Sequence, residues 1–325
     1  MTLPAEPPPA TWVIGAGGLL GSAVCRQLTQ DDRVVLTQDV PWGAPAGSLA
    51  ALEAGIERLL ALGPRWRVLW CAGAGVIGTG QDQLDEEVEV LTGFLDRLLV
   101  AVAGREDLAG ALFVASSAGG VYAGSTGPPF TELTEPRPIS PYGEAKLRSE
   151  QLAGAFGRAS GVPTFVGRIA NLYGPGQDTT KPQGLISQLC RAHLVRQPLS
   201  IYVPLDTARD YLFVDDAARM VLAGLEQVVR EGPDGSRVKI LASQRPTSVA
   251  AILAELRRVT KRRPQVVLGD SPTARYQVRD LRFRSLVWPT VDTCVRTTLA
   301  AGILATLESL GAELRAGRLA LRPPG

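Results

Sequence analysis

The sequence Thr11-Trp-Val-Ile-Gly15-Ala-Gly-Gly18-Leu-Leu-Gly21 lies near the start of the chain and passes from an apolar segment directly into regularly spaced glycines. A helical segment, Ser22 to Leu28, follows without interruption. Glycines at this spacing allow a tight turn, a close approach of the backbone to a pyrophosphate, and close packing of the helix on the sheet. The order strand, glycine turn, helix therefore predicts an α/β fold that binds a dinucleotide at the amino end of the helix.

The composition of the whole chain excludes several classes of function. Its 325 residues include 34 basic and 32 acidic side chains, with no basic run of the kind that follows a phosphate backbone, so nucleic acid is not an expected partner. No run of about 18 apolar residues is present, so a membrane partner is not expected either. The first ten residues are rich in proline and lack the pattern of a signal peptide, which predicts a cytoplasmic protein.

Metal binding and serine–histidine hydrolysis are both disfavoured. The four cysteines, at positions 25, 71, 190 and 294, are far apart and do not have metal-ligand spacing, which predicts reduced and mostly buried thiols. His193 is the single histidine, and a role on a helix surface or in packing is favoured over a catalytic one.

The segments after the glycine turn extend the alternation of strands and helices. Residues 33–37 and 67–71 read as the second and third strands, with a helix between them at 47–62. Asp39 is the best candidate for the acid that binds the ribose, although it lies two positions beyond the strand, and capping a turn is an equal alternative. Ala72 and Gly73, directly after the third strand, are small enough to let a backbone pass close to a cofactor.

Residues 82–103 form the longest helical pattern, and its apolar stripe is wider than one contact with a sheet requires. This width indicates either a subunit contact or a helix buried on two sides within its own domain. The fourth strand, residues 111–117, ends in Ser116 and Ser117, where a doubly wound fold places ligand contacts, and we expect a flexible loop over residues 119–124.

A proton-transfer pair is predicted in Ser140-Pro141-Tyr142-Gly-Glu-Ala-Lys146. Ser140 and Pro141 suit the cap and first turn of a helix. Tyr142 and Lys146 are four positions apart and therefore share one helix face. A lysine ammonium favours the phenolate form of a neighbouring tyrosine and can make it an effective base near neutral pH.

Five motifs in order make the chain resemble the extended short-chain dehydrogenase/reductase family, the NAD-dependent epimerases and dehydratases that act on nucleotide sugars. They are Gly15-x-x-Gly18-x-x-Gly21, Ser116-Ser-Ala-Gly-Gly-Val-Tyr122, Pro141-Tyr142-Gly-Glu-Ala-Lys146, Arg168-Ile-Ala-Asn171-Leu-Tyr-Gly174-Pro-Gly176 and Ala208-Arg209-Asp210-Tyr-Leu-Phe-Val-Asp215-Asp216. Together they cover about residues 11 to 225.

The resemblance implies a role for individual residues. Tyr142 matches the general acid/base, Lys146 the residue that holds the nicotinamide ribose, and Ser117 or Ser116 the hydroxyl that polarises the substrate oxygen; we favour Ser117. The implied contacts to NAD, with NADP as an alternative, come from Gly15, Gly18, Leu19, Leu20, Gly21, Asp39, Ala72, Gly73, Ser116, Tyr142 and Lys146. The implied contacts to the nucleotide sugar come from Ser117, Asn171, Arg209 and Arg279, although Asn171 could instead only hold a loop.

The chain also departs from the pattern of this family. Ala118 stands where many relatives have the catalytic hydroxyl, and Glu89 stands where an asparagine is frequent. The acid that usually precedes the third strand and touches adenine is not evident near Arg65. Gly119 and Gly120 replace the Asp–Glu pair of sugar 4,6-dehydratases, which argues against dehydration.

These observations predict a Rossmann-type doubly wound parallel sheet with a small C-terminal substrate-binding lobe. Residues 1–175 would form the core, with 206–245 returning to it, and 176–205 and 246–325 would form the lobe. A nucleotide-sugar epimerase is the favoured function, an NAD(P)H-dependent 4-ketoreductase is the alternative, and a non-catalytic dinucleotide sensor is a further one. We expect a homodimer formed through the helices at 82–103 and about 142–158.

Overall fold

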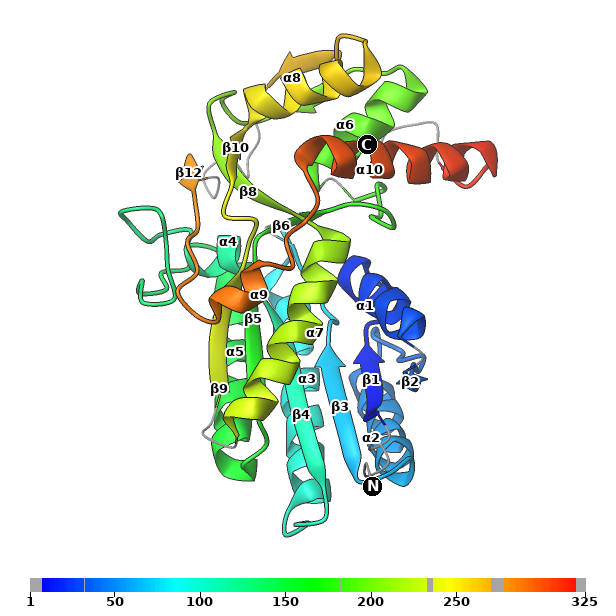
Figure 1. Cartoon of the computed structure of the whole chain (residues 1–325), viewed down its shortest axis with the longest axis vertical. Helices are drawn as coiled ribbons and strands as arrows, with labels where there is room; N and C mark the ends of the chain where they lie inside the picture. The colour runs from blue at the N-terminus through cyan, green and yellow to red at the C-terminus, as the bar shows by residue number, and fades with distance from the viewer. Residues whose placement is uncertain are drawn as a thin grey trace, which may run out of the picture.

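The computed structural model describes residues 8–31, 33–76, 78–181, 183–232, 236–269 and 278–319. Its larger part is a six-stranded sheet in the order β2-β1-β3-β4-β5-β9, in which every neighbouring pair is parallel (Figure 1). The strands are β1 (Ala10–Ile14), β2 (Val35–Leu36), β3 (Arg65–Trp70), β4 (Ala109–Ser117), β5 (Thr164–Ile169) and β9 (Ser236–Leu241). The predicted doubly wound parallel sheet is confirmed.

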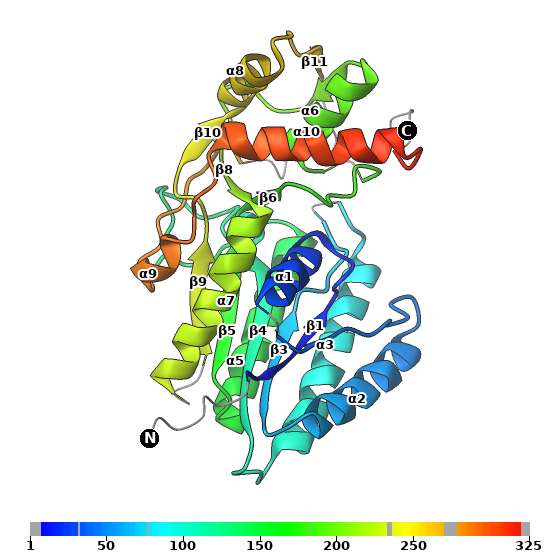
Figure 2. The same cartoon turned by 45° about the vertical axis from the view of Figure 1, so that its right-hand side comes forward.

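Helices cover both faces of this sheet, as a buried parallel sheet requires (Figure 2). Successive residues of a strand point to opposite faces, so Val13 joins the core on one face and Trp12 and Ile14 join the core on the other. The first face is covered by α1 (Leu19–Gln30) and α7 (Val214–Glu231), and the second by α2 (Pro45–Ala61), α3 (Gln81–Val102) and α5 (Pro141–Ser160).

The smaller part lies beyond the carboxyl ends of the parallel strands (Figure 1). Its main sheet has the order β10-β8-β12, with β6 also pairing with β8, and a separate pair joins β7 to β11. The strands are β6 (Asn171–Tyr173), β7 (Leu199–Ile201), β8 (Ala208–Phe213), β10 (Pro246–Ser248), β11 (Val266–Leu268) and β12 (Asp280–Leu281). The helices are α6 (Leu185–Val195), α8 (Val249–Thr260) and α10 (Leu299–Arg315), and their apolar residues form a core of their own.

Two details of the expected organisation are wrong. The chain returns to the Rossmann layer through α7 and β9, whereas β8, which carries Arg209, belongs to the sheet of the smaller part. The segment expected to be a loop after β4 begins with a helical turn, α4 (Ala118–Val121), because the Ser117 hydroxyl caps it by accepting a hydrogen bond of 3.1 Å from the amide of Gly120.

The wide apolar stripe of α3 is largely used within the chain. Val90, Leu91, Phe94 and Leu98 are all buried, because α3 lies between α2 and α5. Val100, near the end of the helix, is 78% exposed. The stripe is therefore explained mostly by burial on two sides, and the expected homodimer stays a prediction.

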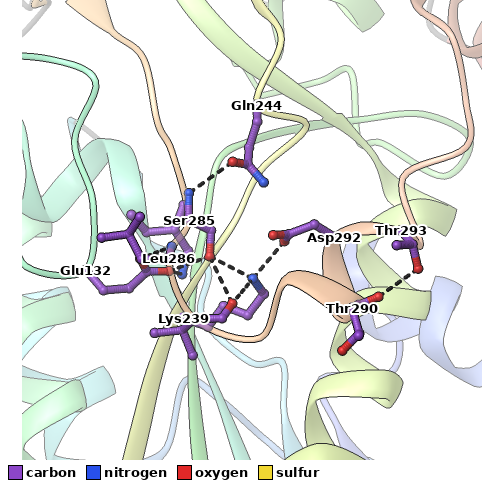
Figure 3. Close-up of polar contacts among 10 residues, drawn as sticks. Glu132, Lys239, Gln244, Ser285, Leu286, Thr290, Asp292 and Thr293 are labelled. Atoms are coloured by element: carbon purple, nitrogen blue, oxygen red, sulfur yellow. Dashed lines mark hydrogen bonds and ion pairs between the residues drawn. The ribbon is translucent and has the colours of Figure 1, made fainter.

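A buried polar cluster ties the C-terminal segment to the β9 edge of the sheet (Figure 3). Lys239 of β9 is fully buried and donates to the Ser285 hydroxyl at 2.7 Å, the Val287 carbonyl at 2.6 Å and the Asp292 carboxylate at 2.7 Å. Asp292 belongs to α9 (Pro289–Asp292). The Glu132 carboxylate accepts from the same Ser285 hydroxyl at 2.6 Å and from the amide of Leu286 at 2.8 Å. Lys239 thus joins β9 to residues 285–287 and to α9, and Glu132 is linked to it through Ser285.

All four cysteines are free thiols; Cys190 is buried and the others are half-buried. None of the helices in the described ranges is long and apolar enough to cross a membrane.

Candidate active site

The glycine turn between β1 and α1 is shaped so that side chains cannot enter it. Gly15 has φ +84°, and a Cβ built on it would lie 2.7 Å from Cα of Ala72. A Cβ on Gly21 would collide with the carbonyl oxygen of Gly15. Gly18 precedes the first residue of α1, and the first turn of that helix carries no acidic residue. Free helix amides beside an exposed glycine surface fit the pyrophosphate of a dinucleotide.

The segment after β2 is less well matched to a ribose. Asp39 is exposed and lies three positions beyond Leu36, the last residue of the strand. The side chain of the preceding residue, Gln38, is turned to α2, where it donates to the carbonyl of Ala51 and accepts from Arg58 at 3.2 Å. The proximity of Arg58 to this segment could not be foreseen, because the two are 20 residues apart.

The predicted tyrosine–lysine pair lies on one face of α5. Ser140 caps the helix as predicted, since its Oγ accepts from the amide of Gly143 at 3.2 Å. The Nζ of Lys146 lies 5.7 Å from the centre of the Tyr142 ring. A Cβ built on Gly120 would lie 3.1 Å from that ring, so α4 and the start of α5 are in close contact.

The loop after β3 connects this pair with the glycine turn. Gly73 has φ +143°, and a Cβ built on it would lie 3.0 Å from Nζ of Lys146. Glu87 of α3 accepts hydrogen bonds from the amides of Ala74 at 2.9 Å and Gly75 at 2.8 Å. Glu89, which stands where relatives often have an asparagine, is exposed. The helical period of the sequence does not identify Glu87 as a residue that binds this loop. Only the hydrogen bonds to Ala74 and Gly75 in the folded chain do so.

The two serines at the end of β4 have different surroundings. Ser116 is buried and donates to the Glu150 carboxylate at 2.6 Å. Glu150 is itself buried and accepts from Nε and Nη2 on one edge of the Arg168 guanidinium, at 3.0 Å and 2.6 Å. Arg168 also donates to the Tyr122 hydroxyl at 2.5 Å. Burial alone would lower the pKa of Arg168, and its bonds to Glu150 raise it above the ordinary value.

Ser117 is half-buried and uses its oxygen to accept from the amide of Gly120. A hydroxyl that accepts one hydrogen bond still has a proton to donate. Ala118, at the position where a hydroxyl is frequent, is completely buried. Of these three residues, Ser116 donates its proton to Glu150 and Ala118 has no hydroxyl, which leaves Ser117 as the candidate hydroxyl.

Apart from Ser117, the candidate substrate residues lie in the smaller part. Arg209 of β8 is mostly buried, its Nη1 donates to the carbonyl of Ala208 at 2.9 Å, and burial lowers the pKa of its guanidinium. Asn171 is exposed at the start of β6, the strand that pairs with β8. Asp210 is fully buried and holds the amide of Ser243 at 2.7 Å, so its role is to fix a turn.

Arg279, the remaining candidate, is highly exposed and forms an ion pair with Asp206. His193 lies elsewhere, in a cavity of about 300 Å³ in the smaller part, and its pKa is lowered by burial and by Arg262. None of the predicted site residues lines that cavity, and a role for His193 outside catalysis stays a prediction.

Comparison with known proteins places this geometry in a family. The model of the NAD dependent epimerase/dehydratase family matches residues 11–240. A dTDP-glucose 4,6-dehydratase of Salmonella typhimurium is 40% identical over 113 residues, which is 35% of this chain and 29% of that protein. The chain therefore matches less than a third of the length of this curated relative.

Two solved structures cover nearly the whole chain. The UDP-glucose 4-epimerase of Thermotoga maritima, solved with UDP-glucose, has a TM-score of 0.76 at 22% identity and covers 94% of this chain and 99% of that one. MoeE5 in complex with UDP-glucose and NAD has a TM-score of 0.72 at 26% identity, with the same coverage. At 22% identity, the similarity to the Thermotoga maritima structure shows a shared fold only.

Proposed function

Because this chain belongs to the NAD-dependent epimerase/dehydratase family, we propose that it is a nucleotide-sugar 4-epimerase. The observation that carries the proposal is the position of Tyr142 and Lys146, with Gly120 against the tyrosine ring and Gly73 against the lysine ammonium. These contacts, with the loop after β3 on one side and α4 on the other, support a proton-transfer role for the pair. A protein that only bound a dinucleotide would not need such a pair, which disfavours the non-catalytic alternative.

NAD would bind at the carboxyl ends of the parallel strands, beside the amino end of α1. The amides of Leu19 and Leu20 at the start of α1 would hold its pyrophosphate, and Ala72 and Gly73 would lie along its path toward Lys146. When bound, NAD supplies a ring that takes up hydrogen from a sugar carbon and gives it back. We propose Asp39 as the contact to the ribose.

Three side chains would handle the proton at the sugar hydroxyl. Tyr142 would remove it as a general base and return it as a general acid. Lys146 would stabilise the phenolate by its positive charge, and Ser117 would donate a hydrogen bond to the sugar oxygen. In an epimerase the substrate and the product both carry a hydroxyl at the same carbon. One tyrosine that first removes and then returns the proton is sufficient for such a reaction.

The region around Gly120 supports epimerisation over dehydration. A Cβ at this position would lie 3.1 Å from the Tyr142 ring and 3.3 Å from Cα of Gly143, so a larger side chain would crowd both. Neither Gly120 nor the neighbouring Gly119 supplies the acid that a dehydratase would need. Small residues at Ala72 and Gly73 leave the other side of the site unobstructed. During epimerisation the sugar must present first one face and then the other face of a carbon to the nicotinamide ring. This change of face requires free space around the sugar.

Arg209 is the proposed partner of the substrate pyrophosphate. Its guanidinium is largely withdrawn from water, and a diphosphate would provide the opposite charges that compensate for this burial. Asn171 and Arg279 would supply further polar contacts, with Arg279 first leaving Asp206.

A 4-ketoreductase is the second candidate. It would need the same Tyr142, Lys146 and Ser117, but it would have to exchange its dinucleotide in each cycle. The exposure of Asp39 and the presence of Arg65 at the start of β3, where an acid touching adenine is usual, favour a more loosely held cofactor.

The test is an assay of the purified protein with a catalytic amount of NAD and a panel of UDP- and dTDP-hexoses. Interconversion of one 4-epimer pair without net reduction of NAD is the expected result. Stoichiometric oxidation of NAD(P)H by a 4-keto sugar, without interconversion, would replace the epimerase with the ketoreductase.

A further inference from the structure

The loop that follows β3 joins the two halves of the candidate site. Ala72 lies against the glycine turn, since a Cβ on Gly15 would come within 2.7 Å of its Cα. Gly73 lies against α5, since a Cβ there would come within 3.0 Å of Nζ of Lys146. The position of this loop therefore sets the separation between the place for a pyrophosphate and the tyrosine–lysine pair.

Glu87 of α3 holds this loop in place. Its Oε1 accepts from two consecutive amides, those of Ala74 and Gly75. Its Oε2 lies 3.6 Å from a Cβ built on Gly73, the same point that lies 3.0 Å from Nζ of Lys146. The carboxylate and the ammonium are consequently no more than about 7 Å apart, which is the approximate sum of these two distances. Both side chains are half-buried, so water screens their interaction incompletely.

The other charged side chains around Lys146 have different positions. Arg148 of α5 pairs with Asp85 of α3, and Glu150 pairs with Arg168. Glu144 is exposed in the first turn of α5. Of the carboxylates on α3 and α5, Glu87 is the one that the contacts at Gly73 place beside the ammonium.

We propose that Glu87 is a positioning residue with two effects. Its two amide hydrogen bonds fix the loop against which a dinucleotide would lie, and its negative charge offsets part of the stabilisation that the Lys146 ammonium gives to the Tyr142 phenolate. The first effect concerns cofactor binding alone, and the second rests on the proposed function of Tyr142.

Two substitutions separate these effects. Glu87→Gln keeps an oxygen that accepts from both amides but removes the charge, whereas Glu87→Ala removes both the acceptor and the charge. Glu89→Gln is the matched control, because Glu89 is an exposed carboxylate two positions along the same helix. Calorimetry measures NAD affinity, and carbon NMR of tyrosine labelled beside its hydroxyl measures the pH at which Tyr142 ionises, with Tyr142→Phe identifying its signal.

NAD affinity should fall at least about tenfold in Glu87→Ala, since two hydrogen bonds to a charged acceptor are lost. It should stay within about threefold of the unchanged protein in Glu87→Gln and in the control. Tyr142 should ionise at lower pH in Glu87→Gln than in the control, because a negative charge that opposes the phenolate has gone. The buried Tyr122 and the half-buried Tyr211 will not obscure this change, because desolvation raises the pKa of both, that of Tyr211 to about 12.

Unchanged NAD affinity in a folded Glu87→Ala, or identical ionisation of Tyr142 in Glu87→Gln and the control, would overturn the inference. Neither measurement uses a substrate. If both effects appear and no nucleotide sugar reacts, the role of Glu87 stands and the proposed function fails. If a nucleotide sugar reacts and neither effect appears, the proposed function stands and the role of Glu87 fails.

Discussion

The ammonium of Lys146 lies 5.7 Å from the centre of the Tyr142 ring, one helical turn along α5. Tyr142→Phe keeps this packing and removes only the hydroxyl. We expect turnover to fall at least about a hundredfold, the usual scale for a lost acid/base, while the calorimetric affinity for NAD stays within about threefold. A variant that retained more than half of the activity on a verified substrate would rule out Tyr142 as the acid/base.

NAD should bind at least as tightly as NADP. Asp39 follows β2, and its carboxylate would repel a 2′-phosphate. Calorimetry of both dinucleotides measures the ratio, and Asp39→Asn should shift it toward NADP. Asp31→Asn, which changes an exposed acid on the other side of β2, is the control and should leave the ratio unchanged. Tighter binding of NADP to the unchanged protein would reverse the prediction.

Light scattering at micromolar concentration should give the mass of a homodimer. The interface would lie on α3 and α5, where Val100 is 78% exposed. Val100→Asp should then weaken the dimer, whereas Leu304→Asp, at a 48% exposed leucine of α10, should not. A monomeric mass for the unchanged protein, or equal effects of the two substitutions, would contradict this assembly.

Lys239→Met should destabilise the protein strongly. The substitution leaves the Asp292 carboxylate, the Ser285 hydroxyl and the Val287 carbonyl without the ammonium that now binds all three (Figure 3). Losing one partner of a buried pair costs roughly 3–5 kcal/mol, which urea unfolding can measure. Adding Asp292→Asn should restore part of the stability, because it removes the uncompensated charge. A loss below about 1 kcal/mol would show that the cluster does not hold this segment.

Local signals in the sequence were enough to predict the glycine turn, the capped start of α5 and most elements of the parallel sheet. Gly15 and Gly21 could be predicted from their spacing between an apolar strand and a helix. The structure gives the reason for the glycines, because a side chain at either position would collide with the backbone. Ser140 followed by Pro141 marks a helix start without any knowledge of the rest of the chain. The tyrosine–lysine pair could be foreseen because its spacing is that of one helical turn.

Contacts between distant segments could not be predicted in this way. Lys239 reads as an ordinary strand residue, and only the fold brings it to Asp292, 53 residues away. The sequence predicts that β8 belongs to the Rossmann sheet, whereas it belongs to the sheet of the smaller part. The residue pattern of a short strand does not distinguish between the two sheets. Glu87 could not be recognised from the sequence, because it is one of several acids on α3 and only its hydrogen bonds to the loop after β3 distinguish it.

The most direct test of the epimerase proposal follows one hydrogen atom. A nucleotide hexose that carries deuterium at C4 is incubated with the protein and a catalytic amount of NAD, and the product is examined by NMR. The proposal predicts a product inverted at C4 with the deuterium still at C4, because the hydrogen removed from that carbon returns to it. Deuterium found at C6 with loss of water would identify a 4,6-dehydratase, and either that result or a failure to invert any hexose of the panel would contradict the proposal.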